Sequence, residues 1–155
     1  MGRVIRRVES RLTQVVHEGQ VTYGASATRA DKVVGLLREV MSEPAVEEFW
    51  LLLLDGKHRV TGASMVSRGT LTTSLVHPRE VFGPAVRMGA AAVIVCHNHP
   101  SGDPEPSPED LQVTRRLVQG GRLLGIPVLD HLILGDPENF TPKRRYISLR
   151  ERMSF

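Results

Sequence analysis

The chain of 155 residues has one cysteine, Cys96, and this scarcity excludes an internal disulfide. A lone thiol is typical of a protein in a reducing compartment. No apolar run approaches the ~18 residues that a membrane-spanning helix needs. The first residues lack the apolar core of a secretory signal, and internal repeats are missing. These absences predict a cytoplasmic protein without membrane spans.

The composition is that of a globular domain with a mildly basic charge. Hydrophobic residues make up 41% of the chain, and its length suits a single domain with a proper core. The formal net charge is +3 at pH 7. A charge of this size is compatible with nucleic-acid contact but does not indicate it, and nothing in the composition defines an oligomeric state.

The strongest chemical signal begins where an apolar run ends. Residues 90–96 are apolar on both faces and short, so we expect a buried strand. His97 and His99 follow directly. Because residues i and i+2 of a strand point to the same side, the two imidazoles can aim at one point. Cys96 faces away by the same alternation and is not expected to be a ligand.

A helix start supplies a carboxylate. Ser107 is a favourable N-cap, Pro108 suits the first helical position, and Asp110 has the spacing of a capping box. The loop between His99 and Ser107 is short enough to fold Asp110 back over the strand end. Two imidazoles, one carboxylate and a fourth position open to water are the layout of a catalytic zinc site. We therefore predict one Zn²⁺ per chain.

These residues resemble a known metal-binding motif, that of the JAB/MPN (JAMM) zinc metallopeptidases. The shared pattern is His97-x-His99-Pro100 followed by Ser107-x-x-Asp110. Additional phrases are similar to the RadC-like branch of that family, namely His77-Pro78-Arg79-Glu80, Ser101-Gly102-Asp103-Pro104, Gly121 to Ile126, and Leu129-Asp130-His131. The resemblance implies the α/β JAB/MPN fold, similar to that of cytidine deaminases, with a mixed β-sheet flanked by helices.

The resemblance also implies an activity. A zinc-dependent metallopeptidase or isopeptidase would hydrolyse an amide bond of a polypeptide substrate, such as the tail of a ubiquitin-like protein. The resemblance gives the acid/base role to the glutamate before the aromatic residue, which is Glu48. It gives stabilisation of the oxyanion to Ser107. Capping of the helix explains Ser107 equally well, and one hydroxyl can serve both purposes.

Several neighbouring residues have structural interpretations that we prefer. Glu47 is interpreted as a solvated neighbour of Glu48. His77 is expected to cap or pack at a helix start, and His131 to be a hydrogen-bonded core residue. Asp130 is a candidate acceptor for the second N–H of a ligating histidine.

Two segments are predicted along the chain. Residues 1–43 form a lead-in segment with one helix, whose apolar face would pack on the sheet, and residues 44–155 form the JAB/MPN RadC-like domain. Helices are expected at 28–41, 77–88 and 111–120, and strands at 47–54, 58–67, 71–76, 90–96, 126–134 and 143–149. The arginines near the start suit a basic arm or a solvated terminus, of which we prefer the second.

Other functions compete with hydrolysis. A DNA-associated RadC-like protein, related to repair or to mobile elements, would bind DNA with a strong dependence on salt. Long RadC-like proteins carry a helix-hairpin-helix region associated with DNA, and residues 1–43 show no such pattern. A catalytically inactive scaffold would have lost its ligands, whereas all three positions are filled here. The filled site favours a hydrolase.

Overall fold

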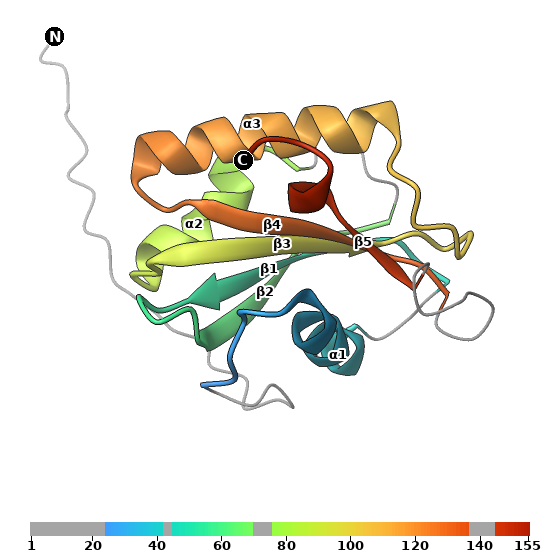
Figure 1. The fold of residues 1–155 in the computed structure, drawn as a ribbon. Coiled ribbons are helices and arrows are strands. Elements are labelled where there is room, and N and C mark those ends of the chain that lie inside the picture. The colour runs from blue at the N-terminus through green and yellow to red at the C-terminus, as the bar shows by residue number, and fades with distance from the viewer. Residues whose placement is uncertain (1–23, 42–44, 70–75, 137–144) are drawn as a thin grey trace, which may run out of the picture.

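The computed structural model describes residues 24–41, 45–69, 76–136 and 145–155, and it shows a sheet between two layers of helix (Figure 1). Within these ranges, five strands lie in the order β2-β1-β3-β4-β5. The pair β3 and β4 is parallel and the other neighbours are antiparallel. The predicted α/β architecture, a mixed sheet flanked by helices, is confirmed.

The elements follow the apolar patterns of the sequence. They are α1 (Ala30–Val40), β1 (Glu48–Leu54), β2 (Val60–Arg68), α2 (Pro78–Arg87), β3 (Ala92–Asn98), α3 (Pro108–Leu124), β4 (Val128–Leu134), β5 (Tyr146–Ser148) and the short 3₁₀ helix η2 (Leu149–Glu151). The strand predicted over 71–76 falls almost entirely outside the described residues. None of the helices in the described ranges has the length and apolar character that crossing a bilayer requires.

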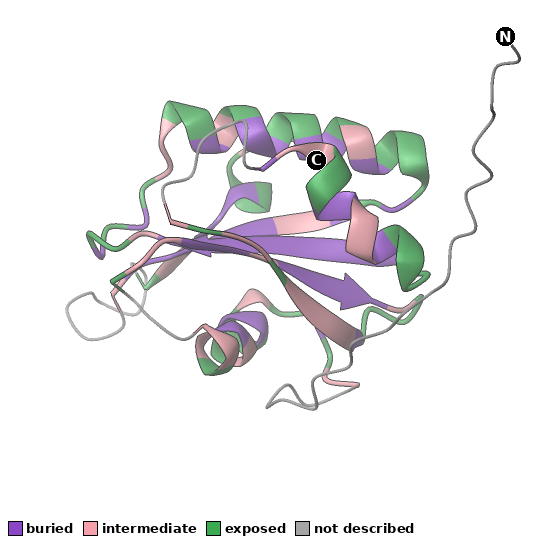
Figure 2. Cartoon of the chain, turned by 180° about the vertical axis from the view of Figure 1, so that it is seen from behind, coloured by how far each residue is buried: buried purple, intermediate pink, exposed green. Residues whose placement is uncertain are grey.

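The strands β1, β3 and β4 are largely buried on both faces, as the purple strands of Figure 2 show, whereas most of β2 is half-buried. On one face, Phe49 and Val95 of the sheet pack with Leu117 beneath α2 and α3. On the other face, Leu52 packs with Leu37 of α1, as expected for this helix. Each buried side chain of this size contributes about 1.5–3 kcal/mol. The two helical layers therefore hold β3 and β1 firmly and fix the positions of the residues at their ends.

The helix α3 is longer than its sequence pattern predicts. Glycines 120 and 121 are expected to end it, but it continues to Gly125, a C-cap residue with φ 69° in the left-handed region. Gly121 is a packing residue instead, because a Cβ there would lie 2.5 Å from the carbonyl oxygen of Ile126. The missing side chain lets α3 approach the chain that enters β4.

Gly121→Ala is expected to destabilise the domain by about 1–3 kcal/mol, since the added methyl group displaces backbone rather than a flexible side chain. The matched control is Gly35→Ala in α1, where a Cβ would meet no atom within 4 Å. That substitution is expected to stabilise the domain by up to about 1 kcal/mol. Chemical denaturation measures both changes. Equal unfolding free energies for the two variants would contradict the close approach of α3.

Candidate metal centre

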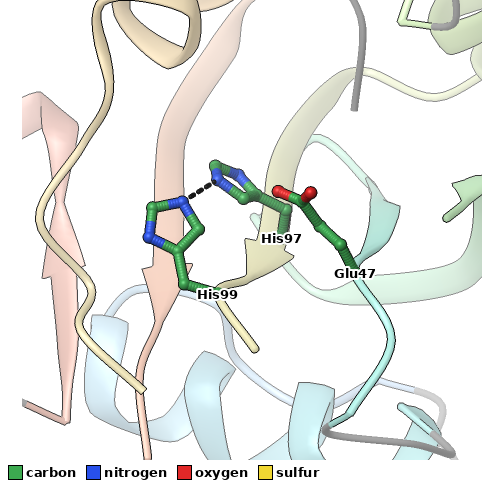
Figure 3. Close-up of side chains that lie close together, drawn as sticks. All are labelled: Glu47, His97 and His99. Carbon is green, nitrogen blue, oxygen red and sulfur yellow. Dashed lines mark hydrogen bonds between the residues drawn. The ribbon is translucent and has the colours of Figure 1, made fainter. Parts of the chain in front are cut away.

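The two histidines converge at the carboxyl end of β3, as strand alternation predicts. His97 lies within the strand and is buried, and His99 follows its end and is half-buried. The strand pairing continues for one residue past β3, because the His99 N–H donates to the Leu134 carbonyl at 2.9 Å. The two Nε2 atoms consequently lie 2.9 Å apart (Figure 3).

Asp110 reaches the same point from the first turn of α3. The predicted capping box is present: Ser107 Oγ accepts from the Asp110 N–H at 3.1 Å, and Asp110 Oδ2 accepts from the Ser107 N–H at 2.8 Å. This reciprocal pair orients the carboxylate. Its Oδ1 lies 3.2 Å from His97 Nε2, and its Oδ2 lies 3.2 Å from His99 Nε2. The structure therefore brings the three predicted ligands together.

The three groups have the spacing of ligands on a single ion. Donor atoms at about 2.0–2.1 Å from a tetrahedral metal lie about 3.3 Å from one another. The two Nε2 atoms lie 2.9 Å apart, and each lies 3.2 Å from a different oxygen of the Asp110 carboxylate, Oδ1 for His97 and Oδ2 for His99. Two imidazole nitrogens and one carboxylate gathered at this spacing suit three ligands of a tetrahedral ion, whose fourth position is left for water or substrate.

The Nδ1 atom of each histidine is engaged on the side away from this point. His99 Nδ1 lies 2.8 Å from the carbonyl oxygen of Asp103. A carbonyl can only accept, so we assign the His99 proton to Nδ1, and Nε2 carries a free electron pair. His97 Nδ1 lies 2.8 Å from His131 Nε2. Both rings are oriented as in histidines that bind metal through Nε2.

Electrostatics keep the carboxylate ionised. Burial raises the pKa of Asp110, but His97 and His99, which donate to the carboxylate whenever their Nε2 atoms carry a proton, outweigh burial, and the pKa falls well below its usual range. Burial lowers the pKa of His99, but the hydrogen bond that a protonated Nε2 makes to Asp110 and the bond from Nδ1 to the Asp103 carbonyl outweigh burial, so the pKa of His99 is raised. A proton at His99 and a metal cation therefore compete for the same site.

Glu47, and not Glu48, lies beside the histidines. Glu47 and both imidazoles offer ligand atoms within 4.8 Å of one another, and Figure 3 shows the Glu47 carboxylate next to His97. The buried side chain of Glu48 lies on the opposite face of the sheet. There its Oε2 accepts from Trp50 Nε1 at 2.9 Å, and its Oε1 lies 3.6 Å from Arg68 Nε. The structure does not bring Glu48 to the candidate ligands.

The register between β1 and β3 explains this placement. Phe49 pairs with His97, and the two rings stack with their centroids 5.9 Å apart. Because side chains alternate along a strand, Glu47 lies on the face of Phe49 and His97, whereas Glu48 lies on the other face. Phe49 is thus a neighbour of the site, and Glu47, two residues before it, lies on the same face of the sheet.

Asn98 is a site residue that the sequence analysis missed. Its Oδ1 accepts from the Glu48 N–H at 2.8 Å, and its Nδ2 donates to the Val46 carbonyl at 2.9 Å. The Asn98 side chain is therefore hydrogen-bonded to the backbone on both sides of Glu47. The His-x-His spacing indicates only that Asn98 lies on the opposite face of the sheet from the ligands, and its contact with the neighbouring strand depends on the fold.

His77 and Cys96, which were not expected to be metal ligands, lie away from the candidate metal centre. His77 caps α2, where its Nδ1 accepts from the Arg79 N–H at 3.3 Å, as expected for a histidine at a helix start. Cys96 is buried among apolar residues on the α1 side of the sheet, as alternation predicts, and burial raises the pKa of its thiol. Neither lies with the histidines of the site.

His131 is the outer partner of a candidate ligand, a role considered above for Asp130. It is buried and hydrogen-bonded to His97, which confirms the interpretation as a core histidine. Burial lowers the pKa of His131 well below its usual value, and the nearby His97 lowers it further. The Asp130 carboxylate instead accepts from the Ser148 hydroxyl and from the backbone N–H of His131, each at 2.7 Å.

The fold and the site define an α/β domain with a candidate three-ligand metal centre. The family model described as "RadC-like JAB domain" matches residues 27–154, and the chain belongs to this family. The resemblance to the RadC-like branch is thereby confirmed. The predicted boundary between residues 43 and 44 stays a prediction.

Known relatives of the chain include proteins named UPF0758. UPF0758 protein STH371 of Symbiobacterium thermophilum is 54% identical over 112 residues, covering 72% of this chain and 45% of that protein. A UPF0758 protein of Trichlorobacter lovleyi is 62% identical over 95 residues, which are 61% of this chain and 41% of that protein. UPF0758 protein TTE0897 of Caldanaerobacter subterraneus is 46% identical over 127 residues, which are 82% of this chain and 52% of that protein. The chain spans about half the length of these relatives, whose names state no activity.

Proposed function

We propose that this domain is a zinc-dependent metallopeptidase or isopeptidase that hydrolyses an amide bond, with one Zn²⁺ held by His97, His99 and Asp110. The observation that carries the proposal is the convergence of the three donor groups beside Glu47. Two imidazoles and one carboxylate suit zinc better than magnesium or calcium, which prefer oxygen ligands alone. A polypeptide substrate, such as the tail of a ubiquitin-like protein, is what the family resemblance implies.

Each reacting group then has a role. Zinc, when bound, would act as a Lewis acid that polarises the amide carbonyl and lowers the pKa of water from its bulk value to about 7. Glu47 accepts a proton from the attacking water and returns it to the departing amine nitrogen. We give this role to Glu47 in place of Glu48 because Glu47 shares a face with the ligands. The Ser107 hydroxyl donates to the oxyanion while its oxygen caps α3.

Metal content gives the direct test of the site. The purified chain is expected to hold about one zinc, and His97→Ala, His99→Ala and Asp110→Asn are each expected to lose it, because a site of three protein ligands loses a third of its donors. Elemental analysis measures zinc per chain. Asp110→Asn keeps a side-chain oxygen for the helix cap, which separates metal loss from unfolding. The control is His77→Ala, and equal zinc content in all variants would overturn the site.

Hydrolysis is tested by a cleavage screen with a peptide library and ubiquitin-like fusions. We expect cleavage that a chelator abolishes and added Zn²⁺ restores. Metal-bound protein that cleaves none of these substrates, yet binds DNA in a salt-sensitive manner, would favour the DNA-associated alternative. The cytoplasmic location stays a prediction.

A further inference from the structure

A buried chain of hydrogen bonds runs behind His97. Its Nδ1 lies 2.8 Å from His131 Nε2, and His131 Nδ1 lies 2.6 Å from the Thr114 hydroxyl. The hydroxyl in turn donates to the backbone carbonyl of Asp110 at 2.6 Å. His97, His131 and Thr114 come from β3, β4 and α3, and all three are 0% exposed. The chain thus connects two candidate ligands through residues that lie outside the metal site.

The direction of every bond in this chain is determined at one end. The Asp110 carbonyl can only accept, so the single hydroxyl hydrogen of Thr114 is used there. The Thr114 oxygen must then accept, which places the His131 proton on Nδ1. A neutral His131 has no second proton, so its Nε2 accepts from His97 Nδ1. His97 is left with an unprotonated Nε2 that points toward His99 and Asp110.

The contacts around His131 agree with these hydrogen-bond directions. The Phe49 ring packs against His131 at 5.5 Å and against His97 at 5.9 Å between centroids. Among the contacts of the described residues, the two ring nitrogens of His131 are hydrogen-bonded to Thr114 and His97 and not to a carboxylate. If the donors and acceptors of these hydrogen bonds were exchanged, the Thr114 hydroxyl oxygen and the Asp110 carbonyl oxygen would lie 2.6 Å apart without a hydrogen between them.

We propose that Thr114 and His131 are positioning residues, which hold His97 in the tautomer with a free Nε2 and thereby set the affinity of the site for Zn²⁺. This inference rests on the proposed metal centre and extends it to residues that touch neither metal nor substrate. Without the Thr114 hydroxyl, His131 can adopt the tautomer with its proton on Nε2, which then donates to His97 Nδ1. The His97 proton must then lie on Nε2, the atom that would bind zinc. Loss of such an outer partner typically weakens metal binding by about 10- to 100-fold.

The test compares Thr114→Val with Thr114→Ser. Valine has nearly the shape of threonine but no hydroxyl, whereas serine keeps it. Competition with a chromophoric chelator is expected to show Zn²⁺ binding about 10- to 100-fold weaker in Thr114→Val and close to wild type in Thr114→Ser. Equal affinities of Thr114→Val and wild type would overturn the inference while leaving the metal centre intact. A wild-type chain that binds no Zn²⁺ would instead overturn the centre itself.

A second measurement needs no variant and no metal. Nitrogen-15 NMR of the metal-free wild type, at a pH where His131 is neutral, is expected to show His131 protonated on Nδ1. In Thr114→Val, a mixture of tautomers is expected at His131. A His131 proton on Nε2 in the wild type would overturn the inference even if Thr114→Val failed to fold.

Discussion

Glu47→Gln is expected to slow hydrolysis by about 10²- to 10⁴-fold while zinc remains bound. The Glu47 carboxylate lies with both imidazoles in a group whose ligand atoms are within 4.8 Å of one another, close enough to take a proton from a water at the open position. Glutamine keeps the shape of the side chain but offers no basic oxygen. The rate on a substrate from the cleavage screen and the zinc content per chain measure the two parts of this prediction.

Glu48→Gln is the matched control, since it makes the same chemical change one residue away on the other face of the sheet. It keeps an oxygen for the Trp50 N–H and loses the charge that faces Arg68. We therefore expect a change in stability without a loss of the hydrolytic rate. An inactive Glu48→Gln beside an active Glu47→Gln would return the acid/base role to Glu48.

The predicted ligands came together because their placement depends on local rules. His97 and His99 share a face through strand alternation, which requires no knowledge of the neighbouring strands. Asp110 is placed by a capping box with Ser107, whose four-residue spacing is visible in the sequence. The fold class follows similarly from the succession of apolar runs, although α3 exceeds its pattern because Gly121 serves packing and not termination.

Other site residues depend on register, which a single sequence does not define. Glu47 and Glu48 are adjacent residues of the same type, and the choice between them follows from the pairing of Phe49 with His97. The contact of His131 with His97 likewise depends on the parallel pairing of β3 with β4. A one-residue shift of either strand would exchange the faces and alter the site. Long-range pairing, rather than residue type, therefore limits prediction here.

Ser107 caps α3 in the structure, and we propose that the same hydroxyl also stabilises the oxyanion. Its Oγ accepts from the Asp110 N–H at 3.1 Å, which is a capping bond and uses only a lone pair. The hydroxyl hydrogen remains for an oxyanion at the open corner of the site. If Ser107 serves both purposes, a variant that keeps the helix start but lacks the hydroxyl should lose activity and keep its stability.

Ser107→Gly is that variant, because glycine at an N-cap costs only a few tenths of a kcal/mol, whereas Ser107→Ala costs about 1 kcal/mol. Both are expected to reduce kcat by about 10²- to 10³-fold, the usual loss when one oxyanion donor is removed. Ser107→Thr keeps the hydroxyl and should retain most of the rate. Denaturation, zinc content and kcat on the same preparations distinguish the roles. If kcat follows stability across the three variants, so that Ser107→Gly stays active, then Ser107 is a cap alone, and the oxyanion must be stabilised by the metal and by other donors.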